Sequence, residues 1–142
     1  MKEVLYSKKR SKPFGSFAQA TVWKGKNEDI IFTAATARNE KGECVGVNDI
    51  KKQTEKALDS IKTSLEQVGA TLNDVMKVTV YVKDMADLSI IHDVRRRYWE
   101  GLTYPASCLV EVSKFVKEEF LIEIDVIAIK ETHNDWGIFK KG

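Results

Sequence analysis

Two long runs of β-branched and apolar residues constrain the fold of this chain more than any other feature. They are Val75–Val82 (VMKVTVYV) and Leu121–Ile129 (LIEIDVIAI). β-branched side chains favour strands. A strand with one face in water alternates apolar and polar residues. These runs are too apolar for such alternation, and their composition is typical of strands that are covered on both sides. The chain is therefore expected to form a sheet with two buried faces.

Two helices are predicted, one before and one after the first of these strands in the sequence. Apolar residues recur with helical spacing over residues 57–68. Asn48 is placed to cap the start of this helix, and Gly69 is placed to end it in the left-handed conformation. A second helix is expected between Asp84, its predicted cap, and Gly101.

The remaining strands complete the predicted order of elements. Residues 17–23 and 28–35 form a predicted hairpin that turns at residues 24–27, and residues 106–112 form a strand that follows Pro105. The order ββαβαββ fits an α+β fold with two helices on one face of a mixed sheet. Two helices hide only one side of such a sheet, so the other side requires a different cover.

Composition and charge argue against several other classes of protein. The 142 residues are 43% apolar, enough for one core of ordinary size, and 23 basic residues nearly balance 21 acidic ones. A net charge of +2 gives no reason to expect nucleic acid as a partner. No run has the ~20 apolar residues that a membrane span requires, and residues 1–10 lack the apolar segment of a signal peptide.

The two cysteines give no indication of a metal site. Cys44 and Cys108 lie far apart in the sequence, without CxxC spacing or a neighbouring histidine. This pattern favours neither zinc nor a disulfide framework. We therefore expect no metal, no cofactor and a reduced, cytoplasmic compartment.

Five sequence blocks, in order, resemble one known family. They are Gly15–Ala20 (GSFAQA), Ile30–Ala35 (IIFTAA), Asp49–Asn73, Val75–Leu88 (VMKVTVYVKDMADL) and Ile122–Ala128 (IEIDVIA). Together they resemble the Rid (YjgF-type) imine/enamine deaminase family over nearly the whole chain. The resemblance implies a chorismate-mutase-like layer and a homotrimer with a barrel-like core, in which active sites lie between subunits. It also implies one domain over residues 1–130 and a C-terminal tail over residues 131–142.

The resemblance gives roles to several side chains. Glu123 matches the family's water-positioning glutamate, and Asp125 is expected on the same face of the strand. Thr33 and Ala34 match the family's Ser-Gly, which makes Thr33 a candidate catalytic hydroxyl and Ala34 a part of the substrate site. Thr33 is equally explained as an ordinary β-branched strand residue.

Two further matches concern substrate binding. Phe17 stands where the family has a tyrosine, and it is equally explained as a core phenylalanine. His92 stands at an asparagine position, where a histidine can donate, accept or take up a proton near neutral pH. Most lone histidines are structural or exposed, which is the alternative for His92.

Ser107 is the main departure from the family pattern. It replaces an arginine that, in the family, binds the substrate carboxylate. Loss of such a charge-assisted hydrogen bond costs about 1.5–3 kcal/mol, so we expect weak activity on the imines of simple amino acids. Leu109 falls at the position of the family's cysteine, whereas Cys108 should face the opposite side of the strand.

Arg38 is the candidate replacement for the missing cation. Its surroundings, TAATARN over residues 33–39, are similar to the 2-aminomuconate deaminase branch, where a basic residue follows the strand. An exposed loop arginine is the alternative. The run Arg95-Arg96-Arg97 is expected on a solvated face of the second helix.

Three functions remain open from the sequence. The first is a deaminase that hydrolyses small-molecule imines or enamines with altered substrate specificity. The second is a non-catalytic homotrimer that binds a metabolite or a protein partner. The third, a ribonuclease, ranks last because the sequence has no pair of catalytic histidines and no focused basic groove. The tail residues Trp136, Ile138 and Phe139 are expected to cover a groove between subunits, with a disordered end as the alternative.

Overall fold

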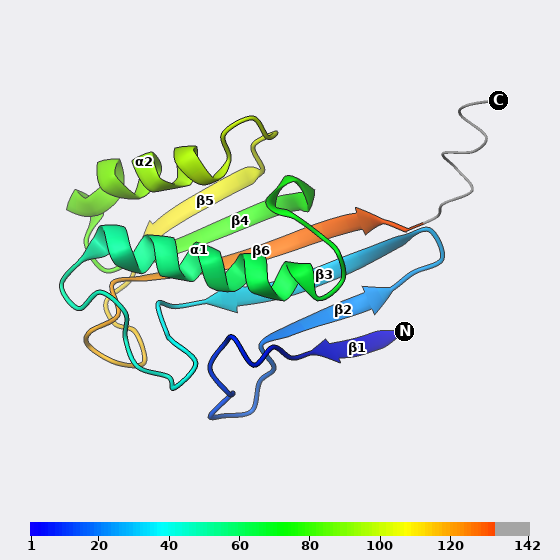
Figure 1. Ribbon diagram of the computed structural model, residues 1–142. Helices are drawn as coiled ribbons and strands as arrows, with labels where there is room; N and C mark the ends of the chain where they lie inside the picture. Colours follow the sequence, from blue (N-terminus) through cyan, green and yellow to red (C-terminus); the bar gives the residue numbers. More distant parts are fainter. Residues whose placement is uncertain (133–142) are drawn as a thin grey trace.

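The computed structural model describes residues 1–132, so the expectation for Trp136, Ile138 and Phe139 lies outside the described residues. One mixed sheet contains six strands in the order β1-β2-β3-β6-β4-β5 (Figure 1). Strands β4 and β5 are parallel, and the other neighbours are antiparallel. The strands are β1 (Lys2–Leu5), β2 (Ala20–Lys24), β3 (Glu28–Ala35), β4 (Val75–Val82), β5 (Ala106–Glu111) and β6 (Ile122–Glu131).

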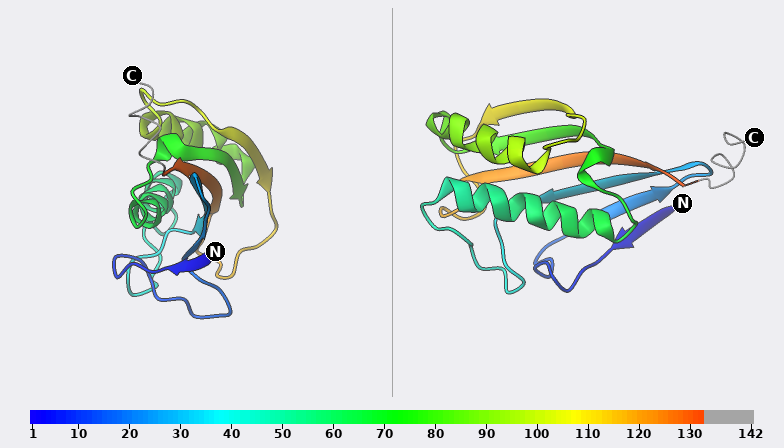
Figure 2. Two further views of the ribbon diagram at one scale, coloured as in Figure 1. Left: turned by 90° about the vertical axis from the view of Figure 1, so that its right-hand side faces the viewer. Right: turned by 45° about the horizontal axis from the view of Figure 1, so that its top comes forward.

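Two helices, α1 (Ile50–Glu66) and α2 (Leu88–Tyr98), lie along the same face of the sheet (Figure 2). The short 3-10 helices η1 (Leu72–Asp74) and η2 (Met85–Asp87) precede β4 and α2. The predicted apolar stripe of α1 is buried against alternate residues of β3, β4 and β6, and together they form the core. The predicted α+β fold, with a mixed sheet and helices on one face, is therefore confirmed.

The ends of the helices agree with the sequence in part. Gly69, at φ 70°, follows α1 in the left-handed conformation as predicted. The cap at the start of α1 is Asp49, whose carboxylate accepts a hydrogen bond from the Lys52 N–H at 3.0 Å. The prediction of Asn48 as the cap was wrong by one residue, because Asn48 is held at φ 61° in the turn before the helix.

The N-terminal region differs most from the sequence prediction. Strand β2 begins at Ala20, so the expected strand from Phe17 was wrong. The buried Gln19 side chain accepts a hydrogen bond from the Ser7 N–H at 2.7 Å and donates to the Ser7 and Ser11 carbonyl oxygens at 3.0 Å. These bonds hold the residues before β2 in a loop. Strand β1 was not predicted, and it forms by pairing with β2 at the sheet edge.

The sheet face opposite the helices is open in a single chain (Figure 2). Its exposed apolar side chains include Trp23, Phe32, Val110, Ile127 and Ile129, and Phe32 is 44% exposed. Clustered apolar side chains of this kind usually mark a surface that another molecule covers. Within residues 1–132, neither helix has the length and apolar character needed to cross a bilayer.

Candidate functional site

A cleft of about 490 Å³ opens beside the start of β6, and we call it the Glu123 cleft. The loop before β2, strand β3, the segment that follows β3 and the start of β6 all contribute to its lining. The cleft brings together several of the predicted site residues, namely Phe17, Thr33, Ala34, Arg38 and Glu123.

Glu123 is a half-buried carboxylate in this cleft. Alternation along β6 turns Ile122 and Ile124 toward the helices and turns Glu123 and Asp125 to the opposite face, as predicted. Burial raises the pKa of Glu123, the Asp125 charge raises it further, and Arg38 opposes both effects. Within residues 1–132, the Glu123 carboxylate has no hydrogen-bond or ion-pair partner. It is therefore available to accept a proton from a water molecule in the cleft.

Arg38 is held in a fixed position near Glu123. Its guanidinium carbon lies 4.6 Å from the centre of the Phe14 ring and 4.5 Å from the centre of the Phe120 ring. Its Nη1 donates a hydrogen bond to the Gly42 carbonyl oxygen at 3.2 Å. Burial lowers the pKa of Arg38, although nearby carboxylates, including Glu123, oppose this. Arg38 therefore places a half-buried positive charge at the cleft, and it is not an exposed loop residue.

The hydroxyl of Thr33 is already engaged in the fold. It donates a hydrogen bond to the Gln19 carbonyl oxygen at 2.8 Å and accepts one from Arg10 Nη1 at 3.1 Å. Thr33 is buried, and its neighbour Ala34 pairs with Asp125 across β3 and β6. Because side chains alternate along a strand, Ala34 shares the face of Glu123, whereas Thr33 turns toward the helices.

Phe17 lies at the rim of the cleft. Its ring packs edge to face against Phe14, with ring centres 5.3 Å apart, and Phe17 remains 54% exposed. The explanation of Phe17 as a core residue is therefore wrong. Its exposed face is available to a ligand or to a neighbouring subunit.

Sequence reasoning missed Arg10, which also lines the Glu123 cleft. Its Nη1 donates to Ser64 Oγ at 2.8 Å, and its Nη2 donates to the Ala34 carbonyl oxygen at 2.8 Å. Burial lowers the pKa of Arg10 to about 10. Arg10 thus ties the N-terminal loop to β3 and α1, and nothing in the basic run that contains it distinguishes it from the preceding lysines.

His92 and Ser107 lie in another cavity, of about 310 Å³, between α2 and the start of β5. We call it the Ser107 pocket, and its other lining residues are Arg95, Arg96, Trp99, Tyr104 and Pro105. A single chain therefore does not bring Ser107 and His92 together with Glu123. Cys108 pairs with Thr79, whereas Ser107 pairs with the buried Val78, so Cys108 faces the opposite side of β5, as predicted.

Comparisons with known proteins agree with this fold. Residues 7–130 match the family model described as endoribonuclease L-PSP. A RutC family protein of Pyrococcus abyssi is 43% identical over 132 residues, which cover 92% of this chain and 98% of that protein. The crystal structure of a Rid family protein from Yersinia pestis is 32% identical, with a TM-score of 0.82, and the match covers 90% of this chain and 98% of that one.

Some relatives have a named activity. The 2-iminobutanoate/2-iminopropanoate deaminase of Escherichia coli is 32% identical over 84 residues, which cover 58% of this chain and 65% of that protein. The family model spans most of the chain and the Pyrococcus relative is matched almost end to end, in agreement with the resemblance seen in the sequence. The chain therefore belongs to the L-PSP endoribonuclease family, which includes the Rid and YjgF-type proteins.

Proposed function

We propose that the protein is a hydrolytic deaminase of small-molecule imines or enamines, with a substrate specificity altered from that of its relatives. The observation that carries this proposal is the half-buried Glu123 carboxylate, which has a raised pKa and no partner within residues 1–132. Carboxylates with raised pKa values in clefts are typical of acid–base sites. The E. coli deaminase among the relatives supports the choice of reaction.

The chemistry requires an acceptor for one proton. A water molecule attacks the imine carbon while Glu123 takes its proton, which gives a tetrahedral carbinolamine. For a protonated imine (C=NH₂⁺), the same proton then returns to the nitrogen and the C–N bond breaks. The hydroxyl proton passes to the departing ammonia, so that a ketone and an ammonium ion are left. One water is consumed for each ammonia released, and neither step needs a cofactor.

A homotrimer is part of this proposal, because it would cover the open sheet face and place the Ser107 pocket of one subunit near the Glu123 cleft of another. Sedimentation equilibrium is expected to give three times the 16.1 kDa mass of the chain. Ile127→Lys, which puts a charge on the open face, is expected to lower that mass. A wild-type chain that sediments as a monomer at micromolar concentration would refute the trimer.

The pH dependence of the reaction gives a further prediction. If Glu123 acts as the base, the rate falls as pH drops through its pKa, which lies above the ordinary value of a glutamate. The Asp125 charge contributes to this rise, so Asp125→Asn should lower the pKa of Glu123 and move the acid limb of the rate profile to lower pH. An acid limb that stays in place would show that another group controls the rate.

The direct test is an ammonia-release assay in which an amino acid oxidase generates imines in the presence of the protein. The proposal expects faster ammonia release than in buffer for at least one imine of a panel that varies in side-chain size. A panel without acceleration would reject the deaminase function. It would favour the non-catalytic metabolite-binding alternative, which the engaged hydroxyl of Thr33 supports.

A ribonuclease function is less well supported by the cleft. Glu123 and Asp125 place two carboxylates on the same face of β6, and Arg38 lies beside them. These carboxylates would repel a phosphodiester, whose binding depends on positive charge. The family description therefore does not by itself carry that activity to this chain.

A further inference from the structure

Three consecutive arginines on α2 have different electrostatic surroundings. Arg96 Nη1 lies 2.6 Å from Asp93 Oδ1, and Arg97 Nη2 lies 3.0 Å from Glu55 Oε2. Arg95 has no carboxylate partner within residues 1–132. Its two neighbours are exposed, whereas Arg95 is half-buried in the Ser107 pocket. The expectation that all three lie on a solvated face is therefore wrong for Arg95.

The hydrogen bond made by Arg95 places its guanidinium at Ser107. Arg95 Nη2 donates to Ser107 Oγ at 2.8 Å, and this is the one hydrogen bond of the Arg95 side chain within the described residues. A guanidinium carries five N–H groups, so most of its donors remain available. Burial lowers the pKa of Arg95, and no nearby carboxylate opposes this shift. An arginine partly removed from water without an anion is expected to gain stability from binding one.

Trp99 lines the same pocket and carries an unsatisfied donor. Its side chain is 2% exposed, and within residues 1–132 its indole Nε1 is buried without a hydrogen-bond partner. A buried indole N–H usually has an acceptor. Within residues 1–132, Arg95 therefore has donors left over after its bond to Ser107, and the indole N–H of Trp99 has no acceptor. An anionic group in the Ser107 pocket would supply an acceptor to Arg95.

We propose that the Ser107 pocket binds the carboxylate of a small organic acid and that Arg95 is the cation that holds it. In the resembled family, the arginine stands at position 107 on the strand. In this chain, the guanidinium would reach the same place from α2, and Ser107 would position it. Tyr104 and Pro105, which also line the pocket, offer apolar surface to the carbon atoms of the acid.

This inference rests on the proposed function where it concerns turnover, because it identifies the group that binds the substrate carboxylate. It also revises one expectation from the sequence. The loss expected from replacing the family arginine by Ser107 is offset by Arg95, so binding of simple 2-oxo and 2-imino acids is retained. The altered direction of the guanidinium would instead change which side chains of the acid fit.

The test is a binding titration that does not depend on catalysis. The probe is 2-oxobutanoate, the ketone that hydrolysis of 2-iminobutanoate would leave, and butan-2-one is the matched ketone without a carboxylate. Calorimetry is expected to detect 2-oxobutanoate and not butan-2-one. Arg95→Gln should weaken binding of 2-oxobutanoate roughly tenfold to a hundredfold. Arg97→Gln, which removes a neighbouring charge already paired with Glu55, is the control and should leave binding unchanged.

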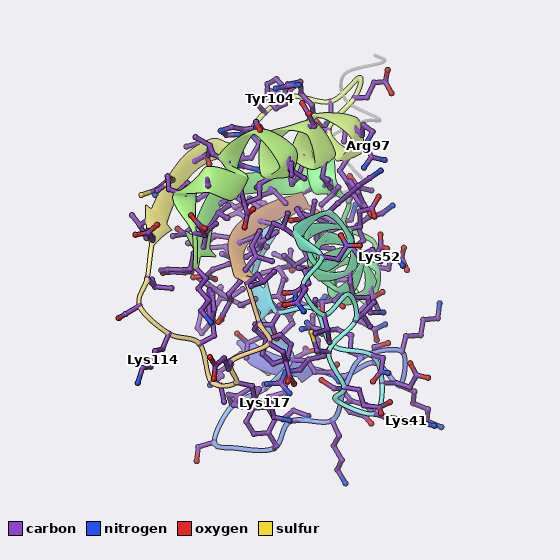
Figure 3. All side chains as sticks on the ribbon, turned by 90° about the vertical axis from the view of Figure 1, so that its left-hand side faces the viewer. Lys41, Lys52, Arg97, Tyr104, Lys114 and Lys117 are labelled. Carbon is purple, nitrogen blue, oxygen red and sulfur yellow. The ribbon has the colours of Figure 1, made fainter. Side chains whose placement is uncertain are left out.

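Figure 3 shows Arg97 on the α1 side of α2 and Tyr104, which lines the Ser107 pocket, in the loop before β5. Arg97 therefore serves as the control, because its charge is paired with Glu55.

A rescue experiment makes the test more specific. Arg95→Gln combined with Ser107→Arg returns the guanidinium to the strand and should restore binding to within a few-fold of wild type. If Arg95→Gln binds 2-oxobutanoate as tightly as wild type does, the carboxylate site is wrong.

A measurement on the wild-type protein tests the proposal even if the Arg95→Gln variant fails to fold. The indole N–H resonance of Trp99, assigned with a Trp99→Phe variant, should shift on titration with 2-oxobutanoate and stay fixed with butan-2-one. An unmoved resonance at saturating 2-oxobutanoate would overturn the proposal. Binding that depends on Arg95 without any deaminase activity would reject the proposed function and keep the carboxylate site. Deaminase activity and binding that are both unaffected by Arg95→Gln would keep the proposed function and reject the carboxylate site.

Discussion

Glu123→Gln is expected to lower the rate of imine hydrolysis by roughly 10²–10⁴-fold, the contribution typical of a positioned base. Glutamine keeps the size of the side chain and its ability to hydrogen-bond to water, but it cannot take up a proton. Because the Glu123 carboxylate is half-buried and has no partner within residues 1–132, its replacement breaks no ion pair of the fold. The loss should therefore appear in kcat, with the oligomeric state and the thermal stability unchanged.

The measurement is ammonia release from the best imine of the panel, followed at several substrate concentrations. Glu118→Gln, at an exposed glutamate of the loop before β6, is the matched control because it makes the same chemical change outside the cleft. A Glu123→Gln variant with the wild-type kcat would show that Glu123 is not the base. A loss of equal size in both variants would indicate an effect of net charge rather than of the site.

Gln53→Leu is expected to lower the free energy of unfolding by about 2–5 kcal/mol. Gln53 is fully buried, and its Nε2 donates to the carbonyl oxygens of Gly46 at 3.1 Å and of Glu119 at 2.8 Å. Its Oε1 accepts a hydrogen bond from the Leu121 N–H at 2.9 Å. Leucine is close to glutamine in size but leaves these backbone groups without partners, and each buried unsatisfied group costs about 1–3 kcal/mol.

Urea unfolding followed by tryptophan fluorescence measures this change. Gln67→Leu, at an exposed position after α1, makes the same substitution without removing a buried partner and should change stability by less than ~0.5 kcal/mol. Equal stabilities of the two variants would show that the loops do not depend on Gln53. The bonds of Gln53 join the loop before α1 to the loop before β6, and these loops carry Arg38 and Val116 of the Glu123 cleft. Activity should therefore fall together with stability.

Much of the fold follows from short-range patterns in the sequence. The run at Val75–Val82 coincides with β4, and the helical spacing of apolar residues identifies α1, because both patterns repeat with the period of the structure that they form. The same alternation along β6 is enough to place Glu123 and Asp125 on one face. Gly69 was predictable as the end of α1, because the left-handed conformation favours glycine.

The N-terminal loop was not predictable in the same way. Its shape depends on Gln19 and Arg10, which bind backbone and side-chain groups that are distant in the sequence. Phe17 follows an alternating pattern that suits a strand, but these hydrogen bonds hold its segment outside the sheet. Pairing with β2 likewise converts Lys2–Leu5 into an edge strand, although four residues carry too little pattern to predict it.

The sequence by itself determined which residue types the candidate site contains, including the carboxylate at Glu123 and the serine at position 107. Only the tertiary structure decided the electrostatic environment of each charge. Three neighbouring arginines on α2 are alike in sequence, yet Asp93 and Glu55 pair with two of them and leave Arg95 beside Ser107. Burial and pairing are properties of groups brought together from separate elements, so no local pattern carries them.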